Sequence, residues 1–144
     1  MTPIEWLDHT ADAAFRASGE SVDDVFCEAA HALSALMFKL DSPGGQTDIS
    51  RRIDAFAPSL PELLVEWLSE LLAQRELLQA VFTRFEVAIS GDHVSGFHLE
   101  GRAFGETLDC VRHHPGAEVK GITLLGLEVR QDAGAWIAQV VVDV

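Results

Sequence analysis

The sequence has few basic residues, few cysteines and no long apolar run. Its 144 residues include 10 Lys and Arg against 23 Asp and Glu, which gives a formal net charge of −13 at pH 7. This charge repels phosphate backbones and anionic lipid heads, so direct binding to nucleic acid or to a membrane surface is disfavoured. An acidic surface suits metal cations or a basic protein partner, and a charge kept only for solubility explains the composition equally well.

The two cysteines, Cys27 and Cys110, lie far apart and match no metal-ligand or redox spacing, which favours a reducing compartment. The first residues lack the basic and apolar regions of a secretory signal. No apolar stretch approaches the about 20 residues that a membrane-spanning helix needs. We therefore expect a soluble, cytoplasmic protein without a membrane partner. The glycine-rich phosphate-binding, dinucleotide-binding and nucleophile-elbow motifs are absent from the sequence as well.

Two segments have the periodicity of amphipathic helices. Apolar side chains recur every three to four positions over residues 22–38, after a capping signal formed by Ser21 and Asp24. Residues 59–62 combine an N-cap serine, a first-turn proline and a glutamate, which together specify a second helix start. Leucines with helical spacing then continue over residues 63–72.

Short segments bounded by Gly and Asp turns predict strands. These predicted strands cover residues 4–7, 13–17, 49–57, 80–90, 94–104, 122–131 and 135–142. Residues 41–45 are predicted to form a loop. Length and composition indicate one domain over residues 1–144. Two helices among many short strands predict an α+β fold, in which both helices cover one face of a largely antiparallel sheet.

Carboxylates at two distant points of the chain form the first candidate site. Asp8 and Asp12 flank the segment His9-Thr10-Ala11 between two predicted strands, and the last predicted strand leads into Asp143 and the α-carboxylate of Val144. Carboxylates are hard oxygen ligands of the kind that Ca²⁺, Mg²⁺ and Mn²⁺ prefer. Each piece alone is also explained without a metal, by a turn whose side chains cap backbone groups and by a strand that stops at its sheet edge.

A second cluster lies before the last two predicted strands. It contains Asp109, Arg112, His113, His114 and Lys120. Adjacent histidines on an extended chain point to opposite sides and cannot both bind one metal, so exposed loop histidines are the favoured interpretation. Cys110 lies beside them, but no third catalytic group or oxyanion hole accompanies it, and a cysteine hydrolase is not expected. Cys27 falls on the predicted apolar helix face, which favours a buried structural thiol.

Taken in order along the chain, several motifs resemble the archease family. They are His9-Thr10-Ala11-Asp12, Gly19 with the helix running into Glu28-Ala29-Ala30, Leu63-Leu64-Val65-Glu66-Trp67-Leu68, Gly105-Glu106, Lys120-Gly121-Ile122-Thr123 and Val141-Val142-Asp143-Val144. The resemblance implies a non-enzymatic activator of the GTP-dependent RNA-splicing ligase, the tRNA ligase that joins 2′,3′-cyclic phosphate or 3′-phosphate ends to 5′-hydroxyl ends. Archeases promote guanylylation of that ligase and its multiple turnover, and the ligase handles the RNA.

The resemblance also implies which residues carry the function. Archeases hold a divalent metal with the aspartate of the HTAD motif, the C-terminal aspartate and the last residue, which correspond here to Asp12, Asp143 and Val144. Residues implied as supporting or partner-contacting are Asp8, His9, Asp109, His113, Lys120 and Thr123. The family's usual Lys-Ala-x-Thr-Tyr-His is replaced here by Lys120-Gly121-Ile122-Thr123-Leu124-Leu125, so an aromatic ring and an imidazole give way to two leucines.

Two functions of other classes stay open at this point. The same carboxylates suit a stand-alone metal-dependent phosphohydrolase, which needs a nucleophile-activating base near Asp12. A general chaperone or binding module acting through apolar helix faces predicts a large exposed hydrophobic patch. Turnover of a phosphoester without a partner supports the first alternative, whereas suppression of aggregation that survives loss of Asp143 supports the second.

Overall fold

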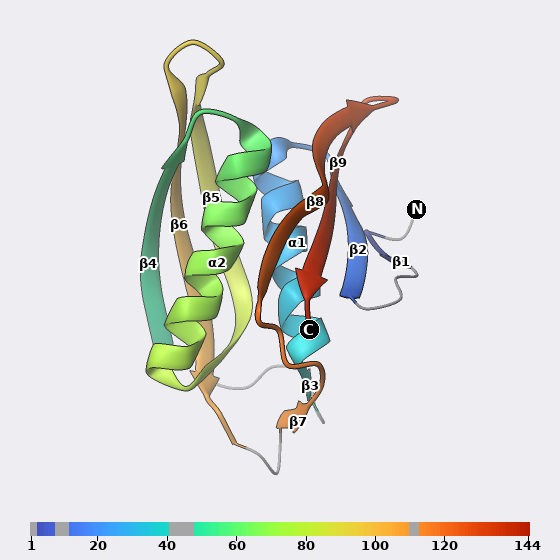
Figure 1. The fold of residues 1–144 in the computed structure, drawn as a ribbon. Coiled ribbons are helices and arrows are strands. Elements are labelled where there is room, and N and C mark those ends of the chain that lie inside the picture. The colour runs from blue at the N-terminus through green and yellow to red at the C-terminus, as the bar shows by residue number, and fades with distance from the viewer. Residues whose placement is uncertain (1–2, 8–11, 41–47, 110–112) are drawn as a thin grey trace.

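The computed structural model describes residues 3–7, 12–40, 48–109 and 113–144, with Asp12 and Leu40 described by their backbone alone. The predicted loop at 41–45 therefore lies outside the described residues. Two helices, α1 (Val22–Met37) and α2 (Leu60–Leu78), lie between two sheets (Figure 1). No helix in the part of the chain that the structure describes is long and apolar enough to cross a membrane.

All strand pairs recorded in the structure are antiparallel. The larger sheet has four strands, in the order β1 (Ile4–Leu7), β2 (Asp12–Gly19), β9 (Ala135–Asp143), β8 (Gly121–Asp132). The second sheet has three, in the order β4 (Ile49–Ala57), β6 (Gly96–Thr107), β5 (Ala80–Asp92). A short pair joins β3 (Phe38–Leu40) to β7 (His113–Pro115). The predicted α+β class is confirmed.

The arrangement of the helices differs from the expected single sheet with one covered face. Helix α1 packs against β5 of one sheet and β2 of the other, and α2 packs likewise against β4 and β8. One continuous core therefore includes Phe15 and Val140 from the four-stranded sheet and Leu99 from the three-stranded sheet. Helical periodicity shows which positions are buried but not what covers them, so it did not reveal the second sheet.

Both predicted helix starts are confirmed by their capping hydrogen bonds. The side chain of Ser21 accepts a hydrogen bond from the Asp24 N–H at 3.1 Å, and that of Ser59 accepts one from the Glu62 N–H at 3.3 Å. These bonds satisfy backbone donors that the first helical turn leaves unpaired. Helix α1 ends one residue earlier than predicted, because Phe38 is extended and begins β3.

The predicted strands over residues 80–90 and 94–104 correspond to β5 and β6, which form a hairpin paired from Ala80↔Thr107 to Asp92↔Gly96. The Asp92 carboxylate accepts hydrogen bonds from the Val94 and Ser95 amides and shapes the connecting turn. Strands β3 and β7 were not predicted, because three residues are too few to show an alternating pattern.

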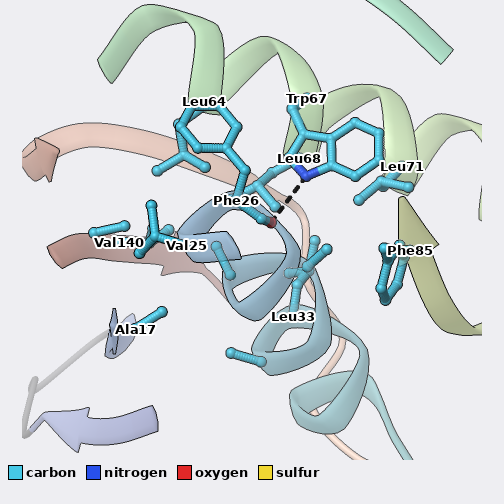
Figure 2. Close-up of a cluster of buried hydrophobic side chains, with 14 of the residues drawn as sticks. Ala17, Val25, Phe26, Leu33, Leu64, Trp67, Leu68, Leu71, Phe85 and Val140 are labelled. Atoms are coloured by element: carbon cyan, nitrogen blue, oxygen red, sulfur yellow. Dashed lines mark hydrogen bonds between the residues drawn. The ribbon is translucent and has the colours of Figure 1, made fainter. Parts of the chain in front are cut away.

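Helices α1 and α2 are joined in the core by a hydrogen bond that Figure 2 shows as a dashed line. The indole Nε1–H of Trp67 on α2 donates to the carbonyl oxygen of Phe26 on α1 at 3.1 Å. Both residues are fully buried. Buried indoles usually find such a polar partner, and this one fixes the helix pair against which the four-stranded sheet packs.

Candidate functional site

The two aspartates predicted from opposite ends of the chain meet at one end of the four-stranded sheet. Asp143, the last residue of β9, is the cross-strand partner of Asp12 on β2 and of Gly121 on β8. Directly opposed residues of an antiparallel pair have Cα atoms about 4.5 to 5.5 Å apart. The sheet register therefore makes neighbours of two residues that are more than a hundred positions apart in sequence.

The backbone at Asp143 is held from both sides. Beyond its pairing with β2, its carbonyl oxygen accepts a hydrogen bond from the Lys120 N–H at 2.7 Å, just before β8 begins. Asp143 and Lys120 are exposed, and Val144 is 37% exposed. Polar groups thus meet water at the end of a fixed strand, which is the placement a ligand or partner contact requires.

The structure describes only some of the other residues predicted for this site. Asp8 and His9 lie outside the described residues. Thr123 is half-buried opposite Val141, two positions along β8 from Gly121. Its hydroxyl donates to the carbonyl oxygen of Leu125 at 3.3 Å, so it bonds to its own strand.

The donor chemistry and the backbone placement fit a divalent cation. Carboxylates suit Ca²⁺, Mg²⁺ or Mn²⁺, and two adjacent carboxylates repel each other unless a cation or a proton neutralises them. Among the side chains that the structure describes, no three of the His, Cys, Asp or Glu type gather as a metal site would require. The predicted ligand set depends on the Asp12 side chain, which is not among those side chains.

The histidine cluster corrects one prediction. His114 is exposed, as expected for a loop histidine, but His113 is completely buried. Its Nδ1 accepts a hydrogen bond from the Asp109 N–H at 2.8 Å, and its Nε2 lies 2.5 Å from Oε1 of buried Glu106. Because Nδ1 is an acceptor, these bonds define a neutral ring that carries its proton on Nε2 and donates it to Glu106.

The buried histidine closes the connection between β6 and β7. The His113 N–H also donates to the Asp109 carbonyl oxygen at 2.6 Å, so two hydrogen bonds join these residues. His113 is the partner of Leu40 in the β3–β7 pair. The structure thus brings the predicted supporting residues Asp109 and His113 together in a contact that orders the backbone.

Cys27 is partly buried on α1, and its Sγ lies 3.6 Å from the carbonyl oxygen of Phe85. Burial raises the pKa of its thiol from the ordinary 9.0 to about 11, and the carboxylates of Asp24 and Asp23 add to the rise. A thiol with so high a pKa is almost wholly protonated at neutral pH. The predicted structural role of Cys27 agrees with this environment, whereas Cys110 lies outside the described residues.

At pH 7 we therefore expect iodoacetamide to alkylate Cys27 about 100-fold more slowly in the folded protein than in the urea-unfolded protein, because two pKa units lower the thiolate fraction by that factor. Peptide mass spectrometry of quenched samples measures the rate. The unfolded thiol loses its proton first, so the raised pKa also makes stability fall as pH rises from 9 to 11. Equal alkylation rates in both states would contradict this environment.

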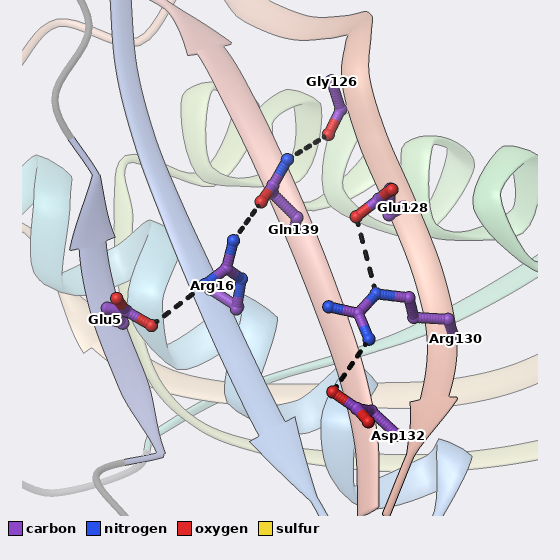
Figure 3. A network of polar contacts seen from close by, with 7 residues as sticks. All are labelled: Glu5, Arg16, Gly126, Glu128, Arg130, Asp132 and Gln139. Atoms are coloured by element: carbon purple, nitrogen blue, oxygen red, sulfur yellow. Dashed lines mark hydrogen bonds and ion pairs between the residues drawn. The ribbon is translucent and has the colours of Figure 1, made fainter.

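A polar network that the sequence did not predict lies on the four-stranded sheet (Figure 3). The Arg16 guanidinium contacts Glu5 at 3.2 Å and donates to the Gln139 side chain at 2.7 Å, and the Gln139 amide donates to the Gly126 carbonyl oxygen at 2.9 Å. The network crosses all four strands and ends at an irregularity in β8. In the sequence, the signal for this irregularity is Gly126, a glycine inside an otherwise regular strand pattern.

This geometry defines a class of protein. Two helices lie between antiparallel sheets, and Asp12 of an early strand pairs with Asp143 of the last strand at one end of a sheet. The model of the Archease protein family matches residues 5–144. The protein archease of Methanosarcina mazei is 38% identical over 97% of this chain and 94% of its own length. That of Pyrococcus abyssi is 33% identical over the full length of both chains. The chain belongs to the archease family.

Two solved structures are similar to this one. A solution structure of a Methanobacterium thermoautotrophicum protein has a TM-score of 0.86 and 33% identity, with both chains fully covered. The crystal structure of a Thermotoga maritima archease, described as a possible chaperone, has a TM-score of 0.58 at 18% identity and covers 96% of this chain and 94% of its own. At that identity the second likeness supports the fold alone.

Proposed function

We propose that the chain is a cytoplasmic, non-enzymatic activator of the GTP-dependent RNA-splicing ligase, and that this activity depends on a divalent cation held by Asp12, Asp143 and Val144. Membership of the archease family supports the proposal. The single observation that carries the site is the cross-strand pairing of Asp12 with Asp143. The two aspartates are thus neighbours on adjacent strands of one sheet. Their positions in the sequence did not by themselves predict this contact.

Each residue of the proposed site has a separate part. Asp12, Asp143 and Val144 supply oxygen ligands, and the Lys120 N–H bond fixes the backbone at Asp143. When bound, Ca²⁺, Mg²⁺ or Mn²⁺ screens the charge of a triphosphate and stabilises the charge that develops in nucleotidyl transfer. Asp8, His9, Asp109, His113, Lys120 and Thr123 are proposed as supporting or partner-contact residues.

The charge of the chain supports separate roles for this chain and the ligase. A net charge of −13 opposes contact with the RNA backbone and favours contact with a basic protein surface. The ligase, which must bind RNA, offers such a surface. The proposal therefore assigns RNA binding to the ligase, and the acidic chain acts on the ligase itself.

The test is to add the purified chain to the ligase of the same organism, with RNA substrate in excess of ligase. Labelled GTP reports guanylylation, and gel analysis reports joined RNA. We expect faster guanylylation and more joined RNA molecules per ligase than the ligase produces alone. The chain alone should join no RNA and cleave no phosphoester.

Other outcomes favour the open alternatives. Hydrolysis of a phosphoester by the chain alone would support a metal-dependent hydrolase. An unchanged ligase together with suppressed aggregation of unrelated proteins would support a general binding module. Either result would contradict the proposed activation.

A further inference from the structure

Two adjacent leucines are the most exposed apolar pair on the four-stranded sheet. Leu124 is 72% exposed and Leu125 is 73% exposed. They lie on a bulge of β8, because pairing with β9 runs as far as Thr123↔Val141 and resumes only at Glu128↔Gln139. Bulges re-aim side chains at the edges of sheets, and β8 is the edge strand here.

The bulge is held in place by hydrogen bonds from both strands. The Gln139 side chain donates to the Gly126 carbonyl oxygen, and the Thr123 hydroxyl donates to the Leu125 carbonyl oxygen. Gly126 itself adopts a φ of 76°, a conformation that favours glycine. Figure 3 shows how Arg16 extends the network that holds Gln139. The two leucines are therefore exposed on a backbone segment whose conformation is fixed by hydrogen bonds.

Leu124 also borders a cavity of about 380 Å³ between β8, α2 and the end of β4. Its described lining includes the apolar side chains of Phe56, Val65 and Ile122 and the carboxylates of Glu62 and Glu66. Phe56 is 62% exposed, so the cavity joins an apolar surface to the bulge. Both charged side chains of this lining are carboxylates, and none of the described lining residues is Lys or Arg. A partner that complements it presents apolar side chains flanked by basic ones.

We propose that Leu124, Leu125 and this cavity form the docking surface for the basic, RNA-binding ligase, an inference that rests on the proposed function. The surface continues from the candidate metal site along the same strand. Gly121, the partner of Asp143, lies three residues before Leu124, about 10 Å along β8. A standard interface covers about 800 Å² of each protein, a patch wide enough to include both the leucines and Asp143.

The decisive variant is the double substitution Leu124→Ser and Leu125→Ser. Its matched control is Leu77→Ser on α2, because Leu77 is 71% exposed and does not line the cavity. Binding to the ligase is measured by isothermal titration at low and high salt, and activation is measured over a range of concentrations. We expect the double variant to raise Kd at least about tenfold and the control to leave it unchanged. Maximal activation should return at saturating concentration.

A second variant tests the charged rim independently of the leucines. Glu66→Lys places a positive charge at the cavity, whereas Glu70→Lys makes the same change one turn further along α2 and outside it. We expect Glu66→Lys to weaken binding more than Glu70→Lys at low salt, with the difference shrinking as salt rises. Melting temperatures equal to that of the wild type establish that each variant is folded.

The outcomes separate this proposal from the proposed function. Wild-type affinity in both the leucine double variant and Glu66→Lys, together with normal activation by the unaltered chain, would overturn the docking surface alone. An unaltered chain that neither binds nor activates the ligase would overturn both proposals. A wild-type dimer that the leucine substitutions convert to a monomer, without change in ligase affinity, would assign the surface to self-association instead.

Discussion

Replacement of Asp143 by asparagine is expected to abolish activation of the ligase while the protein keeps its stability. The substitution retains the shape of the side chain and the backbone carbonyl that accepts the Lys120 N–H, but removes one of two neighbouring carboxylates. A divalent cation loses a charged ligand, so RNA joining should fall to the level of ligase alone. Because Asp143 is exposed, the free energy of unfolding should change by no more than about 0.5 kcal/mol.

The matched control for this experiment is Asp132→Asn at the other end of the same β8–β9 hairpin. Asp132 is exposed and pairs with Arg130 at 3.1 Å, so its loss removes the same charge at a distance from the site. We expect the control to activate the ligase like the wild type. Full activation by Asp143→Asn would remove Asp143 from the site, and an equal loss in both variants would indicate an effect of overall charge.

The largest expected loss of stability comes from Trp67→Ala, which should lower the free energy of unfolding by about 3 to 5 kcal/mol. The indole is completely buried and packs edge-to-face with Phe85, and its ring fills the space over Gly101. Truncation leaves a cavity between the helices and the three-stranded sheet and removes the hydrogen bond to the Phe26 carbonyl (Figure 2). Urea unfolding monitored by circular dichroism measures the change.

Two further variants divide this loss into its parts. Trp67→Phe keeps an aromatic ring but removes the Nε1–H donor, and should cost about 1 to 3 kcal/mol. Leu77→Ala removes a mostly exposed leucine from the same helix and should change stability by less than about 0.5 kcal/mol. A loss below about 1 kcal/mol for Trp67→Ala would show that the indole does not anchor the helix pair.

Elements with a strong local signal were predictable from the sequence. The capping serines Ser21 and Ser59 fix both helix starts because their bonds involve residues only three positions away. The hairpin of β5 and β6 has a similarly local origin in its turn. Strand β7, which carries His113, was not predictable in this way, since its partner β3 lies some seventy residues earlier in the chain.

The candidate site was likewise predictable from the sequence only in part. Carboxylates at Asp12 and Asp143 are visible in the sequence, but periodicity gives no strand order, and only the resemblance to archeases linked them. The observed register supplies the physical link, because β9 lies between β2 and β8. In the sequence, Leu124 and Leu125 are only a departure from the family pattern. The structure adds that they are exposed on the bulge around Gly126.

The most direct test of the central claim is a titration of the ¹⁵N-labelled protein with Mn²⁺, followed by NMR. Paramagnetic Mn²⁺ broadens the signals of nearby nuclei, so the affected amides locate the ion. We predict that substoichiometric Mn²⁺ broadens the amides of Asp12, Gly121 and Asp143 first, and that Asp143→Asn removes this selectivity. Broadening that begins at Asp109 and His114, or that shows no preference for this end of the four-stranded sheet, would contradict the proposed cation site.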